Sequence, residues 1–265
     1  MKKTLVTTIA FTSLFAFNAQ AYDFNNEQCN VDLNGDIKFS EKILSLKTKS
    51  ERIVKITPDY SLYLDGKAVS LSAQEQKWVA QYYNEIQDSI PQVMTVAAEG
   101  VKIANFAVSE VLRGFLGEDS LAATNMEDKL DSLYTGLKSH VYKNPDYLTF
   151  DTQVIEDDLG LGANFDEEID QFVSEIIEQA MGEFFIQMGK NMLSGEGDTS
   201  MTSFEARMEK MGEAIETKVE GQGEMLKRET EKLCEMISTI DATESNIQKI
   251  RGLSDLDLIT FNDKA

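Results

Sequence analysis

The chain has 265 residues, of which 46 are acidic and 25 basic, so its formal net charge at pH 7 is −21. A surface this acidic repels phosphate backbones and anionic lipid head groups, which argues against nucleic acid as a partner. Hydrophobic residues make up 42% of the chain, a share that argues against wholesale disorder and is enough for one well-buried core or two small ones.

The first 21 residues have the pattern of a secretory signal peptide. Lys2 and Lys3 form a positive end, residues 5–17 are an apolar run broken only by Thr and Ser, and Ala19-Gln20-Ala21 is a small-x-small cleavage pattern. We expect cleavage after Ala21, which leaves a secreted chain that starts at Tyr22. No later segment is both apolar and uncharged for 18 residues, so the sequence predicts no membrane span.

Residues 22–71 are expected to form an antiparallel β meander. Asn34-Gly35 lies between two apolar runs and is a strong hairpin signal, because both positions tolerate positive φ. Asp65-Gly66 predicts a second tight turn in the same way, and Pro58-Asp59 predicts a reversal before it. The sequence therefore predicts several short strands that pair in chain order.

Helices are predicted from Ser72 onward. Ser72 and Glu75 have the spacing of a capping box, in which each side chain satisfies a backbone N–H at the helix start. Ser89-Ile90-Pro91 predicts an interruption, after which a long amphipathic helix runs over residues 91–116.

Further elements follow in the second half of the chain. A weaker helix is predicted over residues 121–141, a possible strand at Tyr147–Phe150, and a strong helix over residues 165–193. The Gly- and Ser-containing segment 194–200 reads as a loop.

Apolar residues then recur at intervals of three and four between residues 204 and 240, as in the seam of a coiled coil. The fold class predicted from these patterns is α+β, an N-terminal antiparallel meander followed by a helical hairpin or bundle. We divide the chain into a signal peptide (1–21), the meander (22–71), a helical domain packed on the sheet (72–250) and an acidic tail (251–265).

The chain has two cysteines, Cys29 near its start and Cys234 in its last helix. In an oxidising compartment, two cysteines far apart in sequence indicate one structural disulfide. Two free thiols or a redox pair are the alternatives, although a redox pair is more often a C-x-x-C motif.

Residue types that carry catalysis are scarce. His140 is the only histidine and lies at a predicted helix end, where an imidazolium suits the helix dipole. The acidic runs 156–158 and 166–170 indicate a solvated face or partners of a helix dipole, with weak Ca²⁺ or Mg²⁺ binding as the alternative. Asp32–Asp36 lacks the glycine and glutamate spacing of a calcium loop. We therefore predict no catalytic residue, metal site or cofactor.

Methionine and phenylalanine crowd the last two long helices. Flexible Met-rich surfaces often bind other helices or unfolded segments, so we take Phe204, Met208, Met211 and Ile215 as candidate partner-binding residues. Ordinary core packing at helical spacing is the competing interpretation.

Several short motifs resemble a known family. The run from Leu62 to Leu71, the pair Tyr82-Tyr83, Ile90-Pro91 and Glu99-Gly100 resemble the YggN-like family of periplasmic proteins from Gram-negative gammaproteobacteria. The resemblance implies a periplasmic location and the same overall build. The family is one of unknown function, so it implies no catalytic or binding residues.

The sequence thus predicts a non-enzymatic protein-interaction or chaperone-like module of the cell envelope, which engages another envelope protein, an unfolded client or a second copy of itself. A small-ligand or divalent-cation-binding protein is the first alternative. A carboxylate-based hydrolase is the second, and it requires two carboxylates roughly 5–9.5 Å apart across a cleft.

Overall fold

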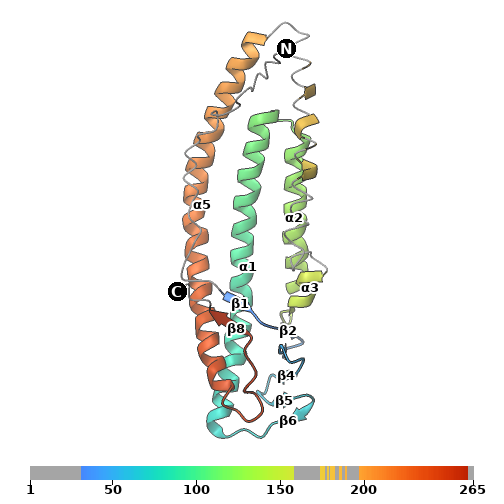
Figure 1. Ribbon diagram of the computed structural model, residues 1–265, viewed down its shortest axis with the longest axis vertical. Helices are drawn as coiled ribbons and strands as arrows, with labels where there is room; N and C mark the ends of the chain where they lie inside the picture. Colours follow the sequence, from blue (N-terminus) through green and yellow to red (C-terminus); the bar gives the residue numbers. More distant parts are fainter. Residues whose placement is uncertain are drawn as a thin grey trace, which may run out of the picture.

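The computed structural model describes residues 31–157 and 197–261, together with 174–176, 178, 180–182, 185, 186 and 189. Within these residues the fold is α+β, a small sheet followed by long helices, as the sequence predicts (Figure 1). The strands are β1 (Val31–Leu33), β2 (Asp36–Ser40), β3 (Ile43–Lys47), β4 (Ile53–Ile56), β5 (Leu62–Leu64), β6 (Lys67–Ala68), β7 (Phe150–Asp151) and β8 (Ile259–Phe261). The helices are α1 (Ala73–Leu116), α2 (Leu121–Val141), α3 (Thr152–Asp157) and α5 (Gly197–Ile247). The predicted signal peptide, residues 1–21, lies outside the described residues.

The main sheet has the strand order β6-β5-β4-β3-β2-β7, and every neighbouring pair is antiparallel. Strands β2 to β6 pair in chain order, which confirms the predicted meander. Apolar residues alternate along the strands and turn one face toward α1, where they are buried. The buried sheet residues include Phe39, Leu44, Leu46, Val54, Ile56 and Leu62.

Helix α1 starts where the sequence predicts. The Ser72 N–H donates to Glu75 Oε2 (2.7 Å), and the Glu75 N–H donates to Ser72 Oγ (3.3 Å), so both halves of the capping box form. The interruption predicted at Pro91 is wrong, because α1 continues through it. Ile90 and Met94 are buried on either side of this proline, and such packing outweighs the roughly 3 kcal/mol that an interior proline costs.

The three long helices form an arm that extends away from the sheet, with α1 between α2 and α5 (Figure 1). Helix α5 has 51 residues and is therefore about 75 Å long. It begins at Gly197, so the loop predicted over 194–200 is wrong for residues 197–200. The described residues between 174 and 189 are helical, in agreement with the helix predicted there.

The predicted strand Tyr147–Phe150 is shifted. Strand β7 consists of Phe150 and Asp151 and pairs with β2 at the edge of the main sheet. Tyr147 instead forms an isolated bridge with Asn144.

The hairpin predicted at Asn34-Gly35 is also wrong. Strand β1 pairs with β8 at the other end of the chain, and β2 pairs with β3 and β7. Gly35 is required here for space, because a Cβ would collide with Lys47 O and lie 2.6 Å from Leu258 Cδ2. The Asn34 N–H donates to Leu258 O (2.6 Å), so the Asn-Gly pair joins the two ends of the chain.

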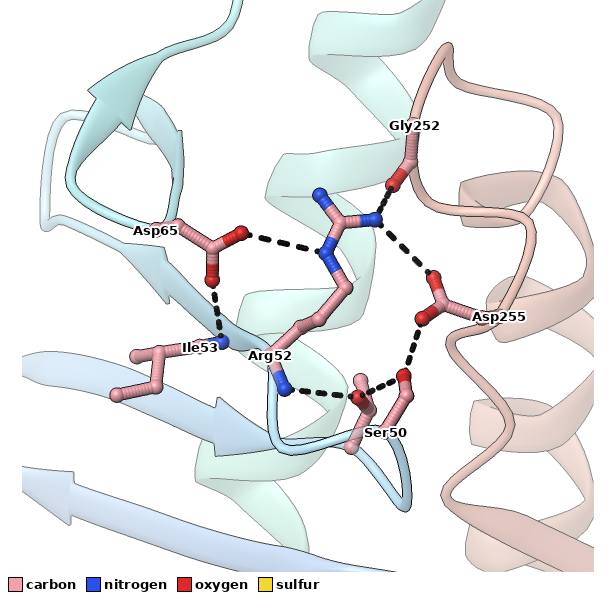
Figure 2. A network of polar contacts seen from close by, with 7 residues as sticks. Ser50, Arg52, Ile53, Asp65, Gly252 and Asp255 are labelled. Atoms are coloured by element: carbon pink, nitrogen blue, oxygen red, sulfur yellow. Dashed lines mark hydrogen bonds and ion pairs between the residues drawn. The ribbon is translucent and has the colours of Figure 1, made fainter.

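A polar network holds the C-terminal segment to the meander (Figure 2). Arg52 donates through Nη1 to Gly252 O (2.8 Å) and through Nε to Asp65 Oδ2 (3.2 Å). Asp255 approaches Arg52 Nη1 at 3.6 Å and accepts a hydrogen bond from Ser50 Oγ (2.5 Å). One arginine thus connects the β3–β4 turn, the β5–β6 turn and the segment after α5.

A buried carboxylate also anchors the C-terminal segment. Glu244 of α5 is 1% exposed and accepts hydrogen bonds from Tyr82 Oη (2.5 Å) and from the N–H groups of Leu258 (2.9 Å) and Ile259 (3.2 Å). Burial raises the pKa of Glu244, and these hydrogen bonds act in the opposite direction. Helix α1, helix α5 and strand β8 therefore meet at one carboxyl group.

Candidate binding pocket

A pocket of about 360 Å³ lies where the sheet, helix α1 and the loop after α2 meet. It is lined by Phe39, Lys42, Tyr83, Gln87, Tyr142, Asn144, Pro145, Asp146, Tyr147 and Leu148. Four of these residues are aromatic and four carry a charged or amide group, so the pocket combines apolar walls with groups that can bind polar atoms.

Two buried aromatic rings belong to the lining of the pocket. Phe39 of β2 is 1% exposed and Tyr83 of α1 is 4% exposed, and their ring centroids are 5.5 Å apart. Tyr60 packs edge-on against Tyr83 at 5.6 Å. Burial, together with the neighbouring Tyr60, raises the pKa of Tyr83, so its hydroxyl stays protonated and donates to Lys42 O at 2.6 Å.

One wall is a strained turn. Ser40 pairs with Ile43, so Glu41 and Lys42 form a two-residue hairpin, with φ angles of 52° and 62°. Such turns favour Asn and Gly, because a side chain in the left-handed region costs about 1–2 kcal/mol per residue. The chain meets this requirement in the usual way at Asp65-Gly66, where φ is 49° and 78°. At the pocket it places a lysine there instead.

The opposite wall is the loop that follows α2. Asn144 Oδ1 accepts a hydrogen bond from the Asp146 N–H (2.9 Å), an arrangement typical of a tight turn. The Asn144–Tyr147 bridge closes this turn. Tyr142, the residue after α2, is 46% exposed at the rim. The loop is thus ordered by its own backbone contacts and keeps its side chains available.

The charged groups of the pocket have no protein partners within the described part of the chain. The Lys42 ammonium and the Asp146 carboxylate form neither a hydrogen bond nor an ion pair there, with each other or with another residue. The Gln87 amide is also without a hydrogen bond in these residues. A bound molecule could therefore use all three groups.

The candidate residues predicted from the sequence lie elsewhere. Met208, Met211 and Ile215 are half-buried on α5 in the arm. Met211 packs so closely on α1 that a Cβ at Gly114 would lie 2.6 Å from its Sδ. These contacts favour core packing for Met211 over a free binding surface. Phe204 is on α5, and its side chain lies outside the described part of the structure.

The predicted disulfide and acidic runs fall partly outside the described residues. Cys234 is 9% exposed on α5, whereas Cys29 lies outside, so their pairing stays a prediction. Of the acidic runs, Glu156 and Asp157 close α3, and residues 158 and 166–170 are not described. Among the residues that the structure describes, no three His, Cys, Asp or Glu side chains gather as metal ligands would.

Sequence reasoning missed the pocket because its residues come from three separate segments. Lys42, Gln87 and Asp146 acquire a shared surface only through the packing of the sheet against α1 and the loop. One local signal exists, the run Tyr142 to Tyr147, in which two tyrosines flank a turn sequence rich in polar residues.

Comparison with known proteins places this chain in a wider group. The family described as "Protein of unknown function (DUF2884)" matches residues 29–259. The "Uncharacterized protein YggN" of Escherichia coli, in strains K12, O6:H1 and O157:H7, is 23% identical over 245 residues, which cover 91% of this chain and 95% of the relative. No solved structure matches the chain. In the described part, none of the helices has the length and hydropathy needed to cross a membrane.

Proposed function

This chain belongs to the DUF2884 family of proteins of unknown function, and we propose that it is a non-enzymatic periplasmic binding protein whose pocket holds a small polar ligand. The signal-peptide pattern at residues 1–21 supports export, and the resemblance to periplasmic proteins supports the compartment. The arm of three helices is then the support on which the pocket and the sheet are mounted.

One observation carries this proposal, namely that the pocket is lined by aromatic side chains and by polar groups that have no partner within the described part of the chain. Tyr142, Tyr147 and Leu148 supply exposed or half-buried apolar surface. Lys42, Gln87 and Asp146 supply hydrogen-bonding groups that have no partner among the residues the structure describes. This combination of mostly apolar walls and a few convergent polar groups is typical of ligand sites, whose volumes are about 300–1,000 Å³.

The same lining gives no support to a hydrolase. Asp146 is the single carboxylate among the lining residues. A glycosidase needs a second carboxylate within roughly 5–9.5 Å to act as nucleophile or base. Binding without turnover is therefore the function that this pocket supports best.

The test is a fragment screen by protein-detected NMR on the mature chain from Tyr22. We expect ligands to shift the resonances of Tyr142 and Tyr147 before those of the arm. Tyr142→Ala should weaken every such ligand, whereas Leu121→Ala, which truncates another exposed side chain at the far end of α2, should weaken none. Fragments that shift only arm resonances, or a library with no hits, would contradict the proposal.

A second candidate function is protein interaction through the helices. Met181 and Ile186 are 50% and 60% exposed, and both are large apolar side chains. Replacing both by serine should abolish capture of an envelope protein or of a second copy, with little loss of stability because the side chains are exposed. Met225→Ser, an exposed position on α5, is the matched control. Capture that survives the double change would remove this candidate.

A further inference from the structure

We propose that the pocket takes a zwitterionic ligand of the size of a free amino acid or dipeptide, with its carboxylate toward Lys42 and its ammonium toward Asp146. This inference rests on the proposed function, since it names the chemical class of ligand for the same pocket.

The charges at the pocket favour a ligand with one charge of each sign. An anion that approaches Lys42 also meets Asp146 and the field of a chain whose net charge is −21. A cation that approaches Asp146 meets Lys42. A neutral ligand displaces water from both charged groups without an opposite charge to replace it, so binding carries an uncompensated desolvation cost. A zwitterion compensates both groups at once.

The rest of the pocket suits the remaining parts of such a ligand. Tyr142, Tyr147 and Leu148, which are exposed or half-buried, offer apolar surface for a side chain. Gln87 and Asn144 offer amide groups of the kind that hydrogen-bond an α-carboxylate or a peptide bond, and the Nδ2 of Asn144 has no hydrogen bond among the residues described. A volume of about 360 Å³ is near the lower end of the range for ligand sites, which fits a small molecule.

The backbone at Lys42 adds a second feature to its position in the pocket. Its φ of 62° is one that a lysine rarely adopts, and Tyr83 Oη holds the residue there through the hydrogen bond to Lys42 O. Glu51 and Tyr60 have similar φ angles of 62° and 60°, but of these three residues only Lys42 lines the pocket. Backbone strain persists where the surrounding structure enforces it, as the Tyr83 hydroxyl does here.

The experiment is an NMR titration of the mature chain at pH 7 with four matched probes. L-Phenylalanine carries both charges, N-acetyl-phenylalanine only the negative one, phenylalanine amide only the positive one, and N-acetyl-phenylalanine amide neither. We expect L-phenylalanine to bind about two- to fivefold more tightly than either singly charged probe, because pairs between exposed charged groups are weak. The neutral probe should bind most weakly.

Variants assign the two charges to residues. Lys42→Gly should remove the preference for L-phenylalanine over phenylalanine amide, and Asp146→Asn should remove the preference over N-acetyl-phenylalanine. Lys143→Ala and Asp88→Asn change the net charge by the same amounts at exposed neighbours that do not line the pocket, so both should keep all preferences.

The outcomes separate this inference from the proposed function. If L-phenylalanine binds no better than the singly charged probes, or if the control variants change the preferences equally, the zwitterion is wrong. If a neutral disaccharide such as N,N′-diacetylchitobiose binds at Tyr142 and Tyr147 while all four probes fail, the ligand class is wrong but the pocket still binds. If neither the probes nor the fragment library reaches the pocket, both proposals fail.

Discussion

Replacing Lys42 by glycine is expected to stabilise the protein, although it removes a side chain that we assign to binding. The φ angle of 62° costs a lysine about 1–2 kcal/mol, and glycine adopts it freely. Glycine also gains conformational freedom in the unfolded chain, which costs roughly 0.5–1 kcal/mol. The expected net gain in the free energy of unfolding is therefore about 0.5–1 kcal/mol, because the exposed Lys42 side chain has no hydrogen bond or ion pair to lose within the described residues.

Urea unfolding followed by circular dichroism measures this change through the midpoint. Lys55→Gly is the matched control, since Lys55 is an exposed lysine in the middle of β4, where φ is ordinary. A glycine there should destabilise the sheet by about 0.5–1 kcal/mol. If Lys42→Gly destabilises the protein as much as Lys55→Gly does, the turn is not strained, and the argument that Lys42 is retained for binding loses its support.

Three further predictions concern the attachment of the C-terminal segment. Burial raises the pKa of Glu244 in the folded protein, so between the two pKa values the folded state binds more protons than the unfolded state. The stability of the wild type relative to Glu244→Gln should therefore fall as pH rises from about 4.5 through that raised pKa. Urea midpoints that change in parallel for both proteins would contradict this. Arg52→Ala removes contacts to both Gly252 and Asp255, so it should lower the free energy of unfolding by about 1 kcal/mol. It should also speed amide hydrogen exchange in the segment after α5 more than in α2. An equal increase in both regions would refute the network's role. The proposed Cys29–Cys234 disulfide is supported by the position of β1, which begins two residues after Cys29 and pairs with β8, a strand that contacts α5. After alkylation of the unfolded, unreduced chain, mass spectrometry should find no labelled cysteine. Labelling of both thiols would reject the disulfide.

Local sequence signals predicted elements whose partners are close in the chain. The capping box at Ser72 and Glu75 and the turn at Asp65-Gly66 both formed as expected, because their interactions involve residues within four positions. Asn34-Gly35 carries an equally strong hairpin signal but lies between strands of different sheets. Its partners, Lys47 and Leu258, are distant in sequence, and no local pattern identifies them.

The pocket and the continuity of α1 show the same limit. Pro91 is a helix breaker by its covalent structure, yet Gln92 donates to the backbone and side chain of Glu229 on α5 and helps hold the helix across it. Lys42 is a strained pocket residue only because β2 and β3 leave two residues for the turn. Both outcomes depend on contacts between elements, which composition and periodicity do not contain.

The pairing of β1 with β8 has a consequence for the order of events during synthesis. Val31 finds its partner only when Phe261 has been made, so the first strand of the fold must wait for almost the entire chain. Contacts with so large a sequence separation form late and slowly. If the chain is exported as we propose, its N-terminal segment has no stable local partner while translation is in progress. Such a segment does not fold prematurely. The chain therefore stays in the extended state that passage through a narrow translocation channel requires.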